Sequence, residues 1–229
     1  MTRPGESVWA LALMQEANDA AALFGQGLAA VGRMRSDYED AVAVMALLAL
    51  GAEKMLKLTI GLNRVEQSGT WPPKVEMIGL GHRIKEAERR ARSALNTEPG
   101  TSVGWMGDLK SQVDADPVLP QVLEALHRFG DRGRFYFLDY LGEAPQPGPA
   151  PSILWQQMTT AIARRDGELL AAIAGGATAA QGRAQVNAII GGSLRRWWEL
   201  YVTAWRTGVI GEQAKQFAPE IKLRGLGGV

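Results

Sequence analysis

Hydrophobic side chains along residues 41–62 recur every three or four positions, which is the period of a helix. The first half of this stretch is apolar on nearly every side, as expected for a helix that is buried around most of its circumference. In the second half charged residues form a polar side, opposite an apolar stripe of Met45, Leu48, Ala52, Met55, Thr59 and Leu62. Ser36 and Glu39 match a capping box, so we predict that this central helix begins near Asp37.

The same period predicts long helices at both ends of the chain. A helix over residues 6–34 has an apolar stripe of Leu13, Ala17, Ala20, Phe24, Leu28 and Val31. Because only a short connection separates it from the central helix, the two should form an antiparallel hairpin. The last long helix, over residues 179–207, carries a stripe of Val186, Ile190, Leu194, Trp197, Tyr201 and Ala204. Thr178 and Gln181 form its capping box, and the tail from Gly208 should be loose.

Shorter helices are predicted between these. One covers residues 75–95, and a polar loop over 96–108 follows it. Asp116 and Pro117 should start the next helix, which Gly130 weakens. The aromatic segment 133–141 should resume as a helix after a kink; a strand is the competing interpretation, but the chain offers no partner strand. We therefore predict an all-α fold, an up-and-down helical bundle with additional long helices at the C-terminal end.

Proline content suggests a division of the chain into two parts. The segment EAPQPGPAP, residues 143–151, contains four prolines and predicts a stiff, extended linker. Residues 1–142 would form the helical bundle. Residues 152–229 would form a C-terminal helical hairpin that packs on the bundle or on a partner.

Composition and charge narrow the class of protein. The 25 lysines and arginines nearly balance the 24 acidic residues, so any basic site must be local. The absence of cysteine excludes disulfides and thiol chemistry. We expect a soluble, cytoplasmic protein without membrane contact, because the longest apolar run is too short to span a bilayer and the first residues lack a signal-peptide core. No metal-like cluster or cofactor motif is found, so neither is expected.

The strongest catalytic candidates lie at the end of the helix that follows Pro117. His127, Asp131 and Arg134 would share one face if that helix were continuous. An acid beside an imidazole orients it, and an arginine can hold a phosphate, so the three would suit acid–base chemistry on RNA. The alternative is a solvated helix end in which Arg134 pairs with Asp131 or Asp139. His82 is most simply the opening residue of the helix over 75–95, bonded to nearby backbone.

Two further sets of residues are candidates for binding. A basic face that could follow a phosphate backbone consists of Arg83, Lys85, Arg89, Arg90 and Arg92. Glu86 and Glu88 could neutralise part of it. The last long helix carries more aromatic surface than one packed face can bury, so a partner or dimer surface is predicted at Arg195, Trp198 and Trp205.

Short motifs of the central helix and its successor resemble HEPN domains (higher eukaryotes and prokaryotes nucleotide-binding). The motifs are Ala52-Glu53-Lys54-Met55-Leu56-Lys57, the loop at Pro72-Pro73, and Gly81-His82-Arg83-Ile84. The resemblance implies a helical bundle from a prokaryotic toxin–antitoxin or antiviral system, often a dimeric ribonuclease. The catalytic members carry an arginine four to six residues before a histidine, and neither histidine here has one.

The resemblance therefore implies a non-catalytic interaction or regulatory protein, forming a homo-oligomer or binding a partner protein, with RNA as a further ligand. One alternative is a metal-independent ribonuclease that uses His127 and the nearby arginines. The other is a helical adaptor unrelated to HEPN domains. Whether the chain is an enzyme is left open, with the missing motif arguing against it.

Overall fold

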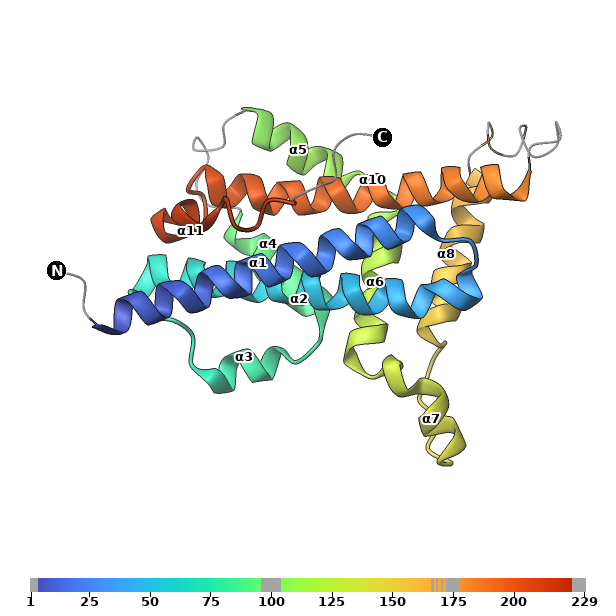
Figure 1. The fold of residues 1–229 in the computed structure, drawn as a ribbon, viewed down its shortest axis with the longest axis horizontal. Coiled ribbons are helices and arrows are strands. Elements are labelled where there is room, and N and C mark those ends of the chain that lie inside the picture. Colours follow the sequence, from blue (N-terminus) through green and yellow to red (C-terminus); the bar gives the residue numbers. More distant parts are fainter. Residues whose placement is uncertain are drawn as a thin grey trace.

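The structure, a computed structural model, is described for residues 4–95, 104–165, 167, 169, 171 and 178–223. Its regular secondary structure is helical, and the described residues include no strand, which confirms the all-α class (Figure 1). None of the described helices is long and apolar enough to cross a membrane.

An antiparallel hairpin of α1 (Pro4–Arg33) and α2 (Asp37–Ser68) forms the centre of the molecule (Figure 1). The apolar stripes predicted for both helices are buried. The Ser36 hydroxyl accepts the backbone N–H groups of Tyr38 and Glu39, as a helix cap should. The reciprocal acceptor, however, is Asp40, which takes the N–H of Ser36 at 3.1 Å, so the predicted role of Glu39 was wrong.

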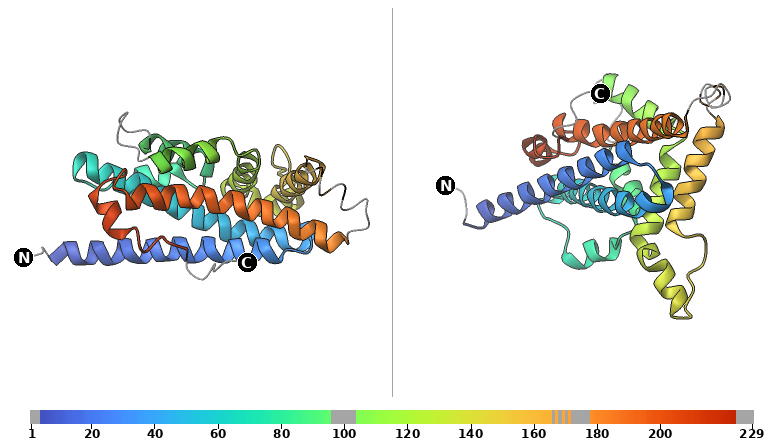
Figure 2. Two further views of the ribbon diagram at one scale, coloured as in Figure 1. Left: turned by 90° about the horizontal axis from the view of Figure 1, so that it is seen from above. Right: turned by 45° about the vertical axis from the view of Figure 1, so that its right-hand side comes forward.

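The long helix α10 (Ala179–Arg206) runs beside the hairpin and closes the same hydrophobic core (Figure 2). It begins at the predicted capping box, in which Thr178 and Gln181 bond to each other's backbone N–H groups. The segment after Gly208 folds back as α11 (Glu212–Phe217). Its anchors are the buried residues Ile210, Ala214, Ala218 and Ile221. The prediction of a loose tail was therefore wrong for the described residues up to 223.

The helix predicted over residues 75–95 is divided into α3 (Lys74–Leu80) and α4 (Ile84–Ala94). The break occurs at Gly81, whose φ of 55° a residue with a side chain rarely adopts. Part of the predicted loop over 96–108 is instead helical, since α5 (Gly104–Asp114) begins within it. The remainder of that loop lies outside the described residues.

The chain then forms α6 (Leu119–Asp131), a 3₁₀ turn (Gly133–Phe135), α7 (Tyr136–Leu141) and α8 (Pro151–Arg165). The helical interpretation of segment 133–141 is thereby confirmed, including its kink. Helix α8 packs against α6, whereas α7 projects away from the body of the molecule (Figure 1 and Figure 2). Buried residues on both sides of the proline-rich segment belong to one core.

Candidate functional site

The predicted basic face of α4 is largely neutralised by its own neighbourhood. Glu86 pairs with both Arg89 and Arg90, at 2.8 and 2.9 Å. Arg92 pairs with Glu88 at 2.8 Å and with Asp114 of α5 at 3.1 Å.

The two cations at the start of α4 are also engaged. Lys85 reaches Glu124 of α6 at 2.5 Å, and Arg83 donates to the carbonyl of Gly79. The five predicted cations do share one region, but they offer little uncompensated positive charge to a phosphate backbone.

His127, Asp131 and Arg134 do not occupy one helical face, because α6 ends at Asp131 and a 3₁₀ turn follows. Arg134 donates to the carbonyl of Gly130 at 3.0 Å, so it pairs with neither Asp131 nor Asp139. Burial lowers the pKa of His127, although the nearby Glu124 and Asp131 act in the opposite direction. The predicted catalytic cluster is therefore not assembled.

A different histidine, His82, pairs with Glu53 where α2 meets the turn between α3 and α4. His82 Nδ1 lies 2.8 Å from Glu53 Oε2, and the other oxygen of Glu53 accepts from Lys57 at 2.6 Å. The sequence predicted that His82 would be bonded to nearby backbone. Its side chain is instead bonded to a side chain of α2. The end of α6 closes tightly over it, because a Cβ on Gly130 would lie 2.7 Å from the His82 carbonyl oxygen.

The chemistry of this pair is that of an oriented imidazole. Glu53 is largely buried and holds one ring nitrogen of His82, while the His82 side chain is 49% exposed. A histidine held in this way can give or take a proton at its free nitrogen, and Lys57 adds a nearby cation. The sequence contained a signal for the pair: Glu53 and His82 belong to two of the three motifs that resemble HEPN domains.

The predicted partner surface on α10 is not a surface. Trp198 stacks on Phe24 with ring centroids 4.3 Å apart, and its indole N–H donates to the carbonyl of Ile221 at 2.8 Å. Trp205 is also buried and donates to the Thr59 hydroxyl at 2.9 Å. Arg195 is exposed, but without the two tryptophans it forms no aromatic patch. The prediction failed because α1 and the returning tail cover a second side of α10.

Exposed apolar side chains are instead concentrated on α7 and the residue before it. We call the α7 surface the set of five whose exposure ranges from 54% to 77%: Phe135, Phe137, Leu138, Tyr140 and Leu141. No residue of α7 is buried. Because α7 projects from the body, this surface is open to a partner (Figure 1).

Hydrogen bonds hold the base of α7 against the proline-rich segment. Arg128 of α6 donates to the carbonyls of Pro147 and Pro149, at 2.7 and 3.1 Å. Gln146 donates to Asp139 at 2.6 Å, and the Tyr136 hydroxyl donates to a backbone carbonyl of the same segment at 3.1 Å. The segment predicted as an extended linker is thus fastened to its surroundings, and it fixes the direction in which α7 projects.

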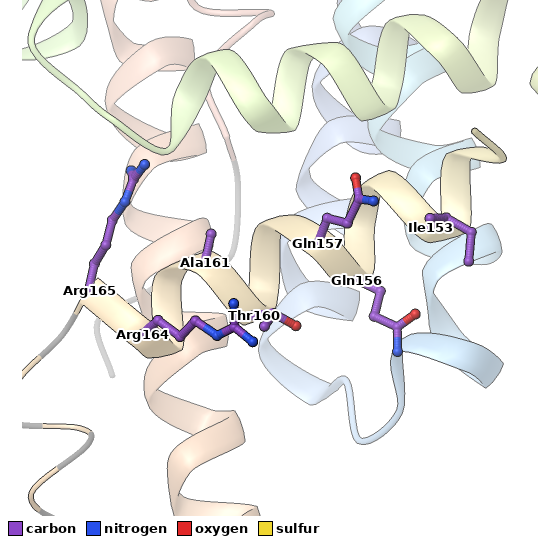
Figure 3. Close-up of a pocket in the computed structure, with 7 residues that line it drawn as sticks. All are labelled: Ile153, Gln156, Gln157, Thr160, Ala161, Arg164 and Arg165. Carbon is purple, nitrogen blue, oxygen red and sulfur yellow. The ribbon is translucent and has the colours of Figure 1, made fainter. Parts of the chain in front are cut away.

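A shallow groove of about 640 Å³ follows the outer side of α8 (Figure 3). Gln156, Thr160 and Arg164 point to one side of the helix, and Arg165 points to the other (Figure 3). An adjoining groove of about 530 Å³ reaches Asp37, which pairs with Arg183 at 2.7 Å and accepts from Thr159. Asp37 thereby joins α2 to Thr159 of α8 and to Arg183 of α10.

No family model, curated protein or solved structure matches the chain. Among the described residues, no group of three or more histidine and acidic side chains could hold a metal ion. The candidate sites are therefore weighed on their own geometry. They are the α7 surface and the pair of His82 and Glu53.

Proposed function

We propose that the protein is a non-catalytic, HEPN-like interaction or regulatory protein of a prokaryotic defence or toxin–antitoxin system, and that it binds its partner through the α7 surface. The observation that carries this proposal is the exposure of five large apolar side chains on a projecting element that is held in place by Arg128. Large, contiguous apolar surfaces on soluble proteins are typical of interaction sites. A rigid aromatic surface also loses little conformational entropy on binding.

The charges of the molecule support an interaction role over RNA binding. The cations of α4 are paired with carboxylates, and the whole chain has a net charge of +1. Nucleic-acid affinity depends mainly on unpaired cations that displace counterions from phosphates. Any binding of RNA should therefore be weak and steeply dependent on salt.

Affinity purification of three forms of the protein tests the proposed surface. We expect a protein that co-purifies with the wild type from the source cells to be lost with the Phe137→Ser/Leu138→Ser double variant. The matched control is Val75→Ser/Ile78→Ser on α3, whose side chains are 75% and 63% exposed against 63% and 64% on α7. Equal recovery by all three forms would contradict the proposal.

A second candidate function, metal-independent cleavage of RNA, is favoured by the oriented His82 rather than by His127. His82 would exchange the proton of the attacking or leaving oxygen, and Lys57 would stabilise charge on the phosphate only by giving up its ion pair with Glu53. Against this function, Arg83 donates to a carbonyl and Lys85 is paired with Glu124, so the surroundings offer few free phosphate ligands.

Incubation with single-stranded RNA and transfer RNA, with and without EDTA, separates the two functions. We expect no cleavage by the wild type. The second function requires cleavage that is lost in His82→Ala and retained in His127→Ala, with the helical circular dichroism spectrum of both variants unchanged. Cleavage that is lost in His127→Ala and retained in His82→Ala would instead favour the cluster predicted from the sequence.

A further inference from the structure

We propose that the partner of the α7 surface includes a second copy of this chain, which binds α7 to α7 about a two-fold axis. This inference rests on the proposed function and names one partner for the same surface. A two-fold interface brings the same patch of both copies together, so a single projecting apolar element is sufficient to form it.

The α7 surface supplies a large part of the area that a stable pair of copies buries. A buried aromatic side chain covers roughly 150–250 Å², so Phe135, Phe137 and Tyr140, which are each more than half exposed, offer on the order of 300–450 Å² per copy. Leu138 and Leu141 add further apolar area. A standard interface buries about 800 Å² per partner. The exposed polar residues at the base of α7 can supply the difference.

The charges around the α7 surface favour a second copy over a partner of a single charge sign. Asp131, Arg132 and Glu143 are exposed, and within the described part of the chain none of them forms an ion pair. Both signs are present, so the rim attracts neither a uniformly acidic nor a uniformly basic surface. In a two-fold pair, Arg132 of one copy can approach a carboxylate of the other, and the reverse contact follows by symmetry. The net charge of +1 adds little repulsion between copies.

The mass in solution is the first test. By light scattering at tens of micromolar, we expect the wild type to have twice the chain mass of 24.7 kDa. The Phe137→Ser/Leu138→Ser variant should have the single-chain mass, and the Val75→Ser/Ile78→Ser control should match the wild type. A monomeric wild type overturns the proposal. A dimer that survives the α7 substitutions also overturns it, since another surface must then hold the copies together.

Crosslinking tests the symmetry, because the chain contains no cysteine and a single introduced thiol can pair only between copies. We expect Leu138→Cys to form a disulfide-linked dimer under mild oxidation, whereas Ile78→Cys on α3 should form no covalent crosslink under the same conditions. Equal crosslinking of the two variants would reflect random collision and would overturn the two-fold pairing. Monomeric wild type that binds phospholipid vesicles through α7 would overturn it in favour of a lipid surface.

The outcomes distinguish this inference from the proposed function. A monomeric wild type whose co-purified protein is lost in the α7 double variant overturns the pairing of copies and leaves the proposed function standing. A dimer that depends on α7 and has no co-purified protein supports the pairing, while the role as a partner-binding regulator then fails.

Discussion

Asp116 joins the start of α6 to α10 from a nearly buried position. Its carboxylate accepts the N–H groups of Val118 and Leu119 at 2.9 and 3.1 Å, and the Arg196 guanidinium lies 2.6 Å away. Burial acts to raise the pKa of Asp116, but these donors outweigh it and lower the pKa. The stabilisation is therefore fully present above the unfolded pKa of about 3.9 and is lost as the pH falls through the lowered folded pKa.

Replacing this carboxylate should change both the stability and its acid dependence. We expect Asp116→Asn to lower the free energy of unfolding at pH 7 by about 1–2 kcal/mol, because the charge-assisted bonds are lost. The difference from the wild type should shrink at pH 3, because this pH lies below the unfolded pKa of about 3.9 and the stabilisation by the carboxylate is already being lost there. Urea unfolding at both pH values measures it. Asp131→Asn, at an exposed site, is the control, and a pH-independent difference would contradict this account.

His127 should remain neutral at pH 7. Burial on α6 lowers its pKa below the ordinary value, so the unfolded chain takes up a proton at a higher pH than the folded chain does. Stability should consequently fall as the pH drops from about 6.5 into the lower folded pKa. The chain has two histidines, so NMR titration can follow each, with His127→Gln identifying the signal. Titration of His127 above about 6.5 would return it to consideration as a proton donor.

At the scale of the element, the packing of α1 on α2 depends on a close approach at Gly51. A Cβ at this position would lie 2.6 Å from the backbone nitrogen of Phe24, and backbone cannot move aside as a flexible side chain can. We expect Gly51→Ala to destabilise the fold by about 1–3 kcal/mol despite the better helix propensity of alanine. Gly32→Ala on α1 has open space around it and should stabilise by about 0.5–1 kcal/mol. Thermal unfolding of the two variants gives the comparison; an equal gain in both would disprove the steric argument.

Helices with a continuous apolar stripe could be predicted from the sequence, and those held by distant contacts could not. The stripes of α1, α2 and α10 are long enough for their period to be unambiguous. By contrast, α11 has six residues and depends on burial of Ile210 and Ala214 against the bundle. The division of residues 75–95 into α3 and α4 follows from the φ of Gly81, which leaves no hydrophobic pattern.

Contacts between distant residues also explain why the candidate sites could be predicted only in part. The arginines of α4 were recognised, but the ion pairs of Lys85 with Glu124 and of Arg92 with Asp114 join different helices and have no sequence spacing. The bond between His82 and Glu53 likewise joins residues that are far apart in the sequence. The aromatic segment 133–141 was recognised as a helix, yet only the arrangement of α6 and the proline-rich segment shows that it projects and stays exposed.

At the scale of the whole molecule, residues on both sides of the proline-rich segment build one core. Phe24 of α1 contacts Trp197 and Trp198 of α10, with ring centroids 5.6 and 4.3 Å apart. Trp197 and Tyr201 also donate hydrogen bonds to Glu88 of α4. This packing argues that a bundle of residues 1–142 is not an independent folding unit, although the proline content alone suggested a boundary there.

A fragment that ends at residue 142 lacks every residue of α8, α10 and α11. Removing α10 uncovers Phe24 and takes away four fully buried side chains, Trp197, Trp198, Tyr201 and Trp205. Truncating one such aromatic residue to alanine costs about 3–5 kcal/mol, so losing all four costs at least as much as the stability of most domains, which is roughly 5–15 kcal/mol. We therefore expect fragment 1–142 to show no cooperative thermal transition and to bind a hydrophobic dye. A fragment of residues 1–223 should unfold in one transition by both circular dichroism and tryptophan fluorescence, because α10 and α11 are retained. Cooperative unfolding of the shorter fragment would contradict this expectation and support an independent N-terminal bundle.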